Sequence, residues 1–473
     1  MMLLFPSKKH AFVVVGCIVM LAVATFFILR GGDDLSCREC NVIIIGVDTL
    51  RADALHSLGY ERETTPTLDA LANKGVIFSQ AISASSWTVP SFMSIFTGMY
   101  PSAHKVTNKF VKFSKDAKIL TNLKDIDPEI ETFAMIMKNA GYATGGFTGD
   151  AGVSAQFGYG QGYDIYTDEK TFGGFENSEQ HALKWLDTLD SKQKFFMFFH
   201  GYDLHGQHDL DDDSSREFVP EYSGTYKGTK EEEAIIREQQ LEWGGLSLTP
   251  GDVAFWRGIY DSKIKDADTR LASFIAELEK RGLLKNTVIV LVSDHGEEFY
   301  EHKGIDHGHS LYDEQVHVPL ILIVPGMTGG RRVDAQVSTM DIAPSILDIL
   351  NIAPSAAFEE QTALRRSLVP YILGLEFRGY DIFTETDYRN SRHLRSVRTA
   401  DGWKYILDLE SKHEELYDLR NDPGELKDLA SSEVKKRDET RRRLLTHMRD
   451  ELHQTLDQEI RTDCLPVYVG ECE

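Results

Sequence analysis

The chain has 473 residues, of which 42% are hydrophobic and 26% charged. This composition is typical of a globular protein with a large packed core, and it excludes a disordered, collagenous or multi-spanning membrane chain. The 74 acidic residues outnumber the 51 basic ones, giving a formal charge of −23. That charge argues against nucleic-acid binding, because such proteins concentrate Lys and Arg against phosphates.

An uncharged apolar run, AFVVVGCIVMLAVATFFIL, covers residues 11–29. It approaches the length of about 20 residues that a helix needs to cross a bilayer. Basic residues before it and acidic residues after it predict that residues 1–10 are cytoplasmic. We expect a single-pass membrane anchor, a tether at 30–40, and a catalytic body on the periplasmic or extracellular side. A cleaved signal peptide and a lipoprotein cleaved before Cys17 are alternatives.

Four further cysteines form two close pairs outside the central region, Cys37 with Cys40 and Cys464 with Cys472. In an exported chain such pairs indicate disulfides that tie down the ends of the folded body. The sequence leaves their connectivity open. A metal or redox site at the first pair is less favoured, since two cysteines supply half of a zinc site.

Continuous apolar, β-branched runs predict strands that are covered on both faces. They lie at residues 41–48, 76–82, 195–200, 287–294 and 320–324, with helical patterns at 66–74, 132–140, 261–281 and 341–350. This alternation predicts an α/β/α sandwich with a large, mostly parallel sheet. Active sites of such sheets lie at the carboxyl ends of the strands. Asp48, His200 and Asp294 each stand at such an end.

Residues 206–252 interrupt the alternation with an acidic cluster and a charged helical stretch near 230–242. We expect this insertion to be a lid that shapes the substrate site, with a solvated excursion as the alternative. From about Arg378 onward, short strands and a very charged helix predict a smaller α+β subdomain. The expected catalytic domain therefore covers residues 41–377, and the C-terminal subdomain covers 378–473.

Asp48, Asp294 and His295 combine two carboxylates and an imidazole at two strand ends. This donor set suits a divalent ion, whereas Asp48 alone would be read as a helix cap. The stretch 87–98, WTVPSFMSIFTG, predicts a helix with a proline in its first turn and a glycine at its end. Thr88 would then lie at a helix N-terminus, where free N–H groups favour an anion.

Together these stretches resemble the sulfatase family of the alkaline phosphatase superfamily over about residues 40–430. The matching segments, in the family's order, are NVIIIGVDTLRAD (41–53), WTVPSFMSIFTGMYPSAH (87–104), FGYGQGYDIY (157–166), HGYDLH (200–205), YDSKIKDADTRLASFIAELEKRG (260–282), SDHGEEF (293–299), HGHSLYDEQVHVPLILIVPG (307–326), VSTMDIAPSILDIL (337–350) and ELYDLRNDPGELKDLA (415–430). The resemblance implies an alkaline-phosphatase-like fold and one divalent metal ion, whether Zn, Mn, Mg or Ca.

Carried over to this chain, the resemblance makes Asp48, Asp294 and His295 metal ligands and Thr88 the nucleophile. It gives His205 and His309 the task of hydrogen-bonding the transferred group or protonating the leaving oxygen. Arg51 would either contact the nucleophile or cap a surface helix, and both interpretations stay open. Further candidates for supporting the ligands or holding a second metal are His200, Asp203, His302 and His307.

The nucleophile position departs from the family pattern. Sulfatases carry a Cys or Ser there, followed by Pro and then Arg, and oxidise it to formylglycine. Thr88 and Phe92 replace the nucleophile and the Arg, so we expect no formylglycine. A threonine hydroxyl beside a metal favours attack on phosphorus through a phosphothreonine.

The sequence therefore predicts a metal-dependent hydrolase or transferase of phosphate esters that acts outside the membrane. Its expected partners are a phosphate-ester or sulfate-ester substrate and the membrane, with no nucleic acid. Two alternatives remain. One is a sulfate-ester hydrolase that uses an unmodified threonine, and the other is an inactive, membrane-tethered binding protein.

Overall fold

The computed structural model describes residues 35–451 apart from gaps at 108–109, 115–116, 121–126, 128, 207–208, 211–215, 242–245, 328, 363–364 and 391. The expected anchor at 11–29 and the pair Cys464 and Cys472 lie outside the described residues. Within the described part, no helix combines the length and the apolar character that crossing a membrane requires. Cys37 and Cys40 form a disulfide immediately before the first strand.

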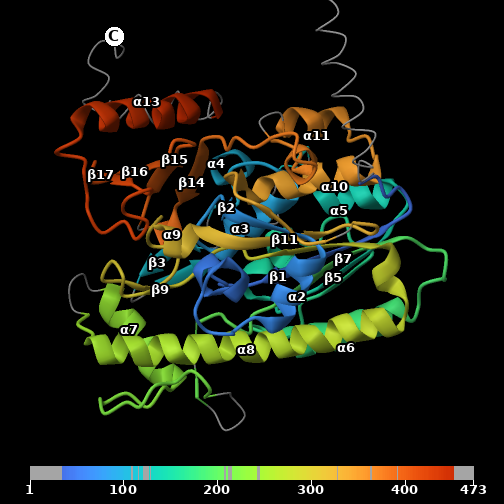
Figure 1. Cartoon of the computed structure of the whole chain (residues 1–473), viewed down its shortest axis with the longest axis horizontal. Coiled ribbons are helices and arrows are strands. Elements are labelled where there is room, and N and C mark those ends of the chain that lie inside the picture. Colours follow the sequence, from blue (N-terminus) through green and yellow to red (C-terminus); the bar gives the residue numbers. More distant parts are fainter. Residues whose placement is uncertain are drawn as a thin grey trace, which may run out of the picture.

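A large mixed sheet forms the centre of the molecule (Figure 1). Its strands lie in the order β12 (Arg331–Val333), β2 (Val76–Ile82), β11 (His317–Ile323), β8 (Thr287–Val292), β1 (Asn41–Val47), β7 (Phe195–Gly201), β5 (Ala143–Phe147) and β6 (Ile165–Thr167), and β13 (Val337–Ser338) pairs with β2. The expected parallel arrangement holds except at β11, which runs antiparallel to β2 and β8. Its connection from β8 contains one four-residue helix, α9 (Asp313–Val316), instead of the long crossover helix that parallel strands need.

Helices cover both faces of this sheet. The strand period of two sends Val42 and Ile44 of β1 to one face, and Ile43 and Ile45 to the other. The first face packs against α3 (Thr88–Thr97), α5 (Phe133–Asn139) and α10 (Ile342–Leu350), and the second against α2 (Pro66–Lys74), α6 (Phe175–Leu186) and α8 (Pro250–Lys280). Figure 1 shows α6 and α8 below the sheet and α5 and α10 above it. The predicted α/β/α sandwich is confirmed.

Helix α8 begins eleven residues earlier than the sequence pattern predicted, at Pro250 instead of residue 261. Thr249 and Asp252 form a reciprocal capping box at this start, a local signal that the hydrophobic pattern did not reveal. The predicted insertion therefore ends within the first turn of α8. Its charged helical stretch is helix α7 (Lys230–Leu241).

The C-terminal part forms a separate antiparallel sheet, as expected for an α+β subdomain. Its strands, in order, are β14 (Ile382–Thr386), β15 (Leu394–Arg398), β16 (Trp403–Asp408) and β17 (Glu414–Asp418). Helix α13 (Val434–Glu451) packs on this sheet, with Leu444 and Met448 against Val397 and Leu416. The remaining short elements are α4 (Pro101–His104), β3 (Phe110–Ser114), β4 (Ala117–Leu120), β9 (Glu298–Phe299), β10 (Ile305–Asp306), α11 (Ala356–Gln361) and α12 (Val369–Ile372).

His302 joins the loop after β8 to this C-terminal part. Its Nδ1 lies 2.5 Å from Oε1 of Glu314, and its Nε2 lies 3.0 Å from the backbone oxygen of Glu425. Burial disfavours the charged imidazolium, but the hydrogen bond and charge of Glu314 outweigh it and raise the pKa of His302 to about 9. The charged form of His302 therefore stabilises the folded state.

We predict that this stabilisation depends on pH. Because the pKa is raised on folding, the stabilisation is complete below the unfolded value of 6.5 and is lost as the pH rises through about 9. It amounts to at most about 3 kcal/mol. Thermal unfolding of the wild type and of His302→Gln should show a melting-temperature gap that is widest below about pH 6.5 and narrows as the pH rises through about 9. A gap independent of pH would contradict the assignment.

Candidate active site

The carboxyl ends of two neighbouring strands bring the candidate metal ligands together. Asp48 directly follows β1, and Asp294 follows β8 after one intervening serine. The two strands are adjacent and parallel, with Gly46 in register with Val292, so both carboxylates emerge at the same edge of the sheet. The predicted convergence of these strand ends is confirmed.

A sharp turn follows Asp48 and ties the two strand ends together. Thr49 has φ 56°, in the left-handed region that β-branched residues rarely adopt. Its backbone N–H donates to Oδ1 of Asp294 (3.4 Å), and the N–H of Leu50 donates to Oγ of Ser293 (2.9 Å). Such strain persists where surrounding contacts enforce it, and it is concentrated at functional sites.

Thr88 is the first residue of α3, and its hydroxyl faces the same edge. Trp87 occupies the N-cap position and makes no side-chain cap hydrogen bond. The hydroxyl donates to Oδ2 of Asp48 at 3.3 Å, and it lies 3.2 Å from Nε2 of His295. The side chain of Thr88 therefore points to the candidate ligands instead of capping its own helix.

Asp48, Asp294 and His295 form a buried set of donors that fits a divalent cation. All three are fully buried, and their ligand atoms lie within 4.8 Å of one another. Nε2 of His295 lies 3.3 Å from Oδ2 of Asp294, while Nδ1 lies 2.8 Å from the carbonyl oxygen of Gly296. An Nδ1–H donated to that carbonyl leaves the Nε2 lone pair directed at the carboxylates, as in metal-binding histidines.

The charge of His307 offsets only part of the cost of burying the carboxylates of Asp48 and Asp294. In the described part of the chain, Oδ1 of Asp48 and Oδ2 of Asp294 have no hydrogen-bond partner. Burial raises the pKa of Asp48 to about 7 and raises that of Asp294 well above its usual value, with the charge of Asp48 adding to the shift. Buried charges of this kind are costly unless an opposite charge is present, so this donor set suits a cation.

His200, predicted as a strand-end residue and as a candidate for supporting the ligands or holding a second metal, lies beside this set. Its Nε2 is 3.6 Å from Oδ2 of Asp48, and its ring packs edge-on against Phe92 and Tyr202. Neither ring nitrogen has a hydrogen-bond partner among the described residues. Burial lowers the pKa of His200 to about 4, so a neutral imidazole borders the candidate ligands.

Two further histidines extend from His295 in a row. The ring of His307 lies 4.3 Å from that of His295, and the ring of His205 lies 5.0 Å from that of His307, centre to centre. Nδ1 of His307 is 2.9 Å from Oδ1 of Asp306 and 3.3 Å from Oε2 of Glu297. Burial disfavours a charge on His307, but these two carboxylates outweigh it and raise its pKa well above the usual value.

His309 lies in a neighbouring cluster. Its Nε2 is 3.0 Å from Oε2 of Glu298 and 3.2 Å from Nε2 of Gln315. No contact joins His309 to Thr88 or to the three candidate ligands among the described residues. The structure thus brings Asp48, Asp294, His295 and Thr88 into direct contact, whereas His205 and His309 reach them only through His307, His205 by a ring contact and His309 by an Nδ1 contact of 3.4 Å with the backbone oxygen of His307.

Arg51 fits neither interpretation left open by the sequence. Its buried guanidinium bridges the carboxylates of Asp53 and Glu301 and donates to the backbone oxygen of Glu297 at 2.9 Å. It therefore braces the loop after β1 against the loop after β8. Asp203 is structural as well, because it accepts the backbone N–H of Phe175 at the start of α6.

The position of the family's motif arginine is filled by an apolar side chain. Phe92 packs edge-on against Phe198 and His200, with ring centres 5.3 and 5.2 Å apart. Gly46 permits this approach, since a Cβ there would lie 2.7 Å from Cζ of Phe92. This part of the site is hydrophobic and offers no cationic group to an anion.

Sequence reasoning missed the glycine that supports Thr88. A Cβ on Gly152 would lie 2.8 Å from Cβ of Thr88 and 3.0 Å from the hydroxyl oxygen of Tyr202. The N–H of Gly152 donates to that hydroxyl at 2.7 Å. The adjacent Asp150 and Ala151 both have positive φ, a backbone feature with no local sequence signal. The close approach fixes Thr88 from the side away from Asp48.

We predict that removing the metal destabilises the protein, because two buried carboxylates then face each other unscreened. A chelator should lower the melting temperature of the wild type by roughly 5 °C or more, and a divalent ion should restore it. Asp294→Asn removes one charge, so its melting temperature should respond less and its bound metal should fall. Asp334→Asn, which alters an exposed carboxylate, should behave as the wild type. An equal chelator response in wild type and Asp294→Asn would contradict this prediction.

Comparison with known proteins identifies the family of this chain. A family model described as "Sulfatase" matches residues 40–352, and one described as "N-sulphoglucosamine sulphohydrolase, C-terminal" matches residues 301–458. Arylsulfatase K of Mus musculus is 24% identical over 83% of this chain and 76% of its own length. A sulfatase of Formosa agariphila is 25% identical over 85% of this chain and 87% of its own.

Solved structures share the fold at low identity. The phosphonate monoester hydrolase of Agrobacterium radiobacter has a TM-score of 0.67 and 20% identity, covering 87% of this chain and 96% of that one. A protein solved with its substrate D-glucosamine-2-N,6-O-disulfate has a TM-score of 0.68 and 18% identity, covering 89% and 100%. With a family match that spans most of its length, the chain belongs to the sulfatase family and is an ester hydrolase of that family.

Proposed function

We propose that this chain is a metal-dependent hydrolase or transferase of phosphate esters with Thr88 as its nucleophile. The observation that carries the proposal is the position of the Thr88 hydroxyl, 3.3 Å from Asp48 and 3.2 Å from His295 within a buried donor set. A nucleophile in contact with a metal site is the arrangement that activates an otherwise weak alcohol.

Asp48, Asp294 and His295 would hold the metal, and the mixed carboxylate and imidazole donors leave Zn, Mn, Mg and Ca as candidates. When bound, a divalent cation supplies positive charge that polarises the phosphoryl oxygens and favours the ionised nucleophile. The chain's own residues hold the nucleophile and the candidate ligands in position. Gly152 and Tyr202 hold Thr88 from one side, and the turn at Thr49 holds the two strand ends together.

In the proposed reaction, Oγ1 of Thr88 forms a bond to phosphorus, while the bond from phosphorus to the leaving oxygen breaks. The hydroxyl proton of Thr88 leaves toward Asp48, which accepts its hydrogen bond. The alcohol departs with the electron pair of the broken bond and takes a proton from the His307 imidazolium, which a proton of the attacking water or acceptor hydroxyl restores in the second step. Water, or an acceptor hydroxyl in a transferase, then attacks the phosphothreonine and restores Thr88.

We assign the interaction with the leaving oxygen to His307, with His205 beside it, in place of the predicted His309. The ring contacts of His307 with His295 and His205 support this choice, because they connect it to Thr88. His309 instead makes its contacts with Glu298 and Gln315. A histidine oriented by carboxylates at Nδ1 is a common donor in acid–base catalysis.

Phosphate is favoured over sulfate by the chemistry of the nucleophile. A sulfothreonine lacks the hydroxyl through which a formylglycine hydrate eliminates sulfate. A phosphothreonine, by contrast, is hydrolysed by in-line attack of water. Phe92 also removes the arginine that accompanies formylglycine in the family motif. Both departures support phosphoryl transfer by an unmodified threonine.

A sulfate-ester hydrolase with an unmodified Thr88 is the second candidate. It is favoured by the names of the relatives, which include arylsulfatase K and an ulvan-active sulfatase of Formosa agariphila. The structural neighbour solved with a sulfated glucosamine points the same way.

We also propose that the enzyme acts on the periplasmic or extracellular side of a membrane, anchored by residues 11–29. The disulfide between Cys37 and Cys40 supports this location, because disulfides persist in oxidising compartments. No nucleic-acid partner is expected for a chain with a formal charge of −23.

We predict that the full-length protein in detergent hydrolyses p-nitrophenyl phosphate in preference to p-nitrophenyl sulfate. Thr88→Ala should lower kcat by at least about a thousandfold, because it removes the nucleophile, while Thr88→Ser should retain part of the activity. Mass spectrometry of acid-quenched wild type should find a phosphate on the peptide that carries Thr88.

Ser91→Ala is the matched control. Ser91 lies three residues further along the same helix and donates to the backbone oxygen of Ser85, so its loss should leave turnover largely intact. A phosphate adduct on Ser91 would refute Thr88 as nucleophile. Faster turnover of the sulfate ester would favour the second candidate.

A further inference from the structure

Two residues of helix α7 in the insertion contact the loop that carries His307. Nε and Nη2 of Arg237 both lie 2.6 Å from Oδ2 of Asp306. Gln240, three residues further along α7, accepts the backbone N–H of Ile305 at 2.6 Å. Both contacts fall on the two-residue strand β10, which directly precedes His307.

Asp306 links these contacts of α7 to His307. Its Oδ2 faces Arg237, and its Oδ1 lies 2.9 Å from Nδ1 of His307. A carboxylate held from one side in this way fixes the imidazole on its other side. The ring of His307 then contacts that of His295, whose Nε2 contacts Thr88. A continuous series of contacts thus leads from α7 to Thr88.

The backbone of Asp306 requires such a restraint. Its φ is 76°, in the left-handed region, which costs free energy for a residue with a side chain. A charge-assisted contact with two guanidinium nitrogens is among the stronger polar interactions available to compensate. The position of His307 therefore depends on a contact made from outside its own loop.

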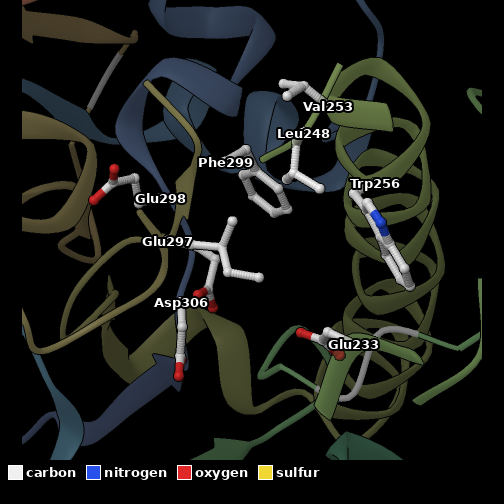
Figure 2. Close-up of a pocket in the computed structure, with 9 residues that line it drawn as sticks. Glu233, Leu248, Val253, Trp256, Glu297, Glu298, Phe299 and Asp306 are labelled. Atoms are coloured by element: carbon white, nitrogen blue, oxygen red, sulfur yellow. The ribbon is translucent and has the colours of Figure 1, made fainter. Parts of the chain in front are cut away.

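The loop, α7 and α8 also border a small cavity. The cavity is lined by Glu233, Leu248, Val253, Trp256, Glu297, Glu298, Phe299, Ile305 and Asp306. Figure 2 shows Glu297 and Asp306 from the loop facing the same space as Glu233 of α7, with Trp256 of α8 across from them. The contacts of Arg237 and Gln240 with the loop thus lie beside this cavity, where the loop, α7 and α8 meet.

Gly206 lets Arg237 reach this position. A Cβ on Gly206 would lie 2.8 Å from Nη1 of Arg237 and 3.1 Å from Oε1 of Glu233. Gly206 directly follows His205, so α7 packs on both loops that carry the additional histidines. The predicted lid is thus already in contact with the catalytic loops.

We propose that Arg237 is a positioning residue, which acts through Asp306 to hold His307 beside the leaving oxygen, so that the insertion completes the active site. This inference rests on the proposed function for the part played by His307. It assigns the insertion a role in catalysis that goes beyond shaping the substrate pocket.

The test compares two phosphate esters whose leaving groups differ in their need for a hydrogen-bond donor. Phenolate is a poorer leaving group than p-nitrophenolate and depends more on a hydrogen-bond donor. Misplacing His307 should therefore slow the hydrolysis of phenyl phosphate more than that of p-nitrophenyl phosphate. In full-length Arg237→Met, kcat for phenyl phosphate should fall at least about tenfold more than kcat for p-nitrophenyl phosphate. KM should change little for both, and Arg237→Lys should recover part of the loss. An equal loss on both esters, as a general structural defect would give, overturns the proposal.

Two variants sharpen this comparison. Asp306→Asn should reproduce the leaving-group effect, and the double variant with Arg237→Met should be no worse than either single variant, because both act on the same histidine. Lys280→Met removes an exposed lysine at the end of α8 that pairs with Glu277, and it should match the wild type. Additive losses in the double variant would overturn the coupling.

A second measurement does not depend on turnover. Hydrogen exchange of the peptide spanning residues 297–307 should be faster in Arg237→Met than in the wild type and restored in Arg237→Lys. If the wild type prefers sulfate esters, the same comparison with phenyl and p-nitrophenyl sulfate applies, and only the phosphate preference fails. If the wild type hydrolyses neither class, the proposed function fails, and unchanged exchange in Arg237→Met would overturn the positioning role by itself.

Discussion

Two buried carboxylates, each with one oxygen that has no hydrogen-bond partner among the described residues, impose the main constraint on this structure. Asp48 and Asp294 meet where β1 and β8 end, and both the loss of hydration and their mutual repulsion penalise the charged forms. A cation relieves both penalties. The surrounding features serve this arrangement: the strained turn at Thr49, the bracing by Arg51 and the approach of Thr88 to the same point.

The candidate site combines residues from strand ends, from a helix, from a loop and from the insertion. The sheet supplies the carboxylates on rigid strand ends, and α3 supplies a hydroxyl on the first turn of a buried helix. A longer loop after β8 supplies His307, and the insertion restrains that loop through Arg237. Rigid elements therefore hold the groups that would bind a metal, whereas loops and the insertion hold the groups that would meet the substrate. Variation in the latter alters specificity without disturbing the former.

Membership of the sulfatase family is compatible with the nucleophile chemistry that we propose, because the fold and the reacting atom are separate properties. The family match covers residues 40–352, which include every strand of the central sheet. At the helix N-terminus, however, a threonine and a phenylalanine replace the residues that formylglycine chemistry uses. Phe92 packs into the aromatic layer beneath His200, so the change is accommodated by the core and leaves the backbone of the site intact.

The sequence by itself determined the sandwich of helices on a central sheet, because long apolar runs and helical periodicity are local properties. It also predicted that Asp48 and Asp294 converge, since residues at the ends of neighbouring strands meet at one edge. Only the tertiary structure decided the antiparallel direction of β11, the ring contact of His307 with His295 and the contact of Arg237 with Asp306. Arg237 and Asp306 are 69 residues apart in the chain. Such contacts depend on how loops and insertions pack on one another, and neither hydrophobic pattern nor residue spacing encodes that packing.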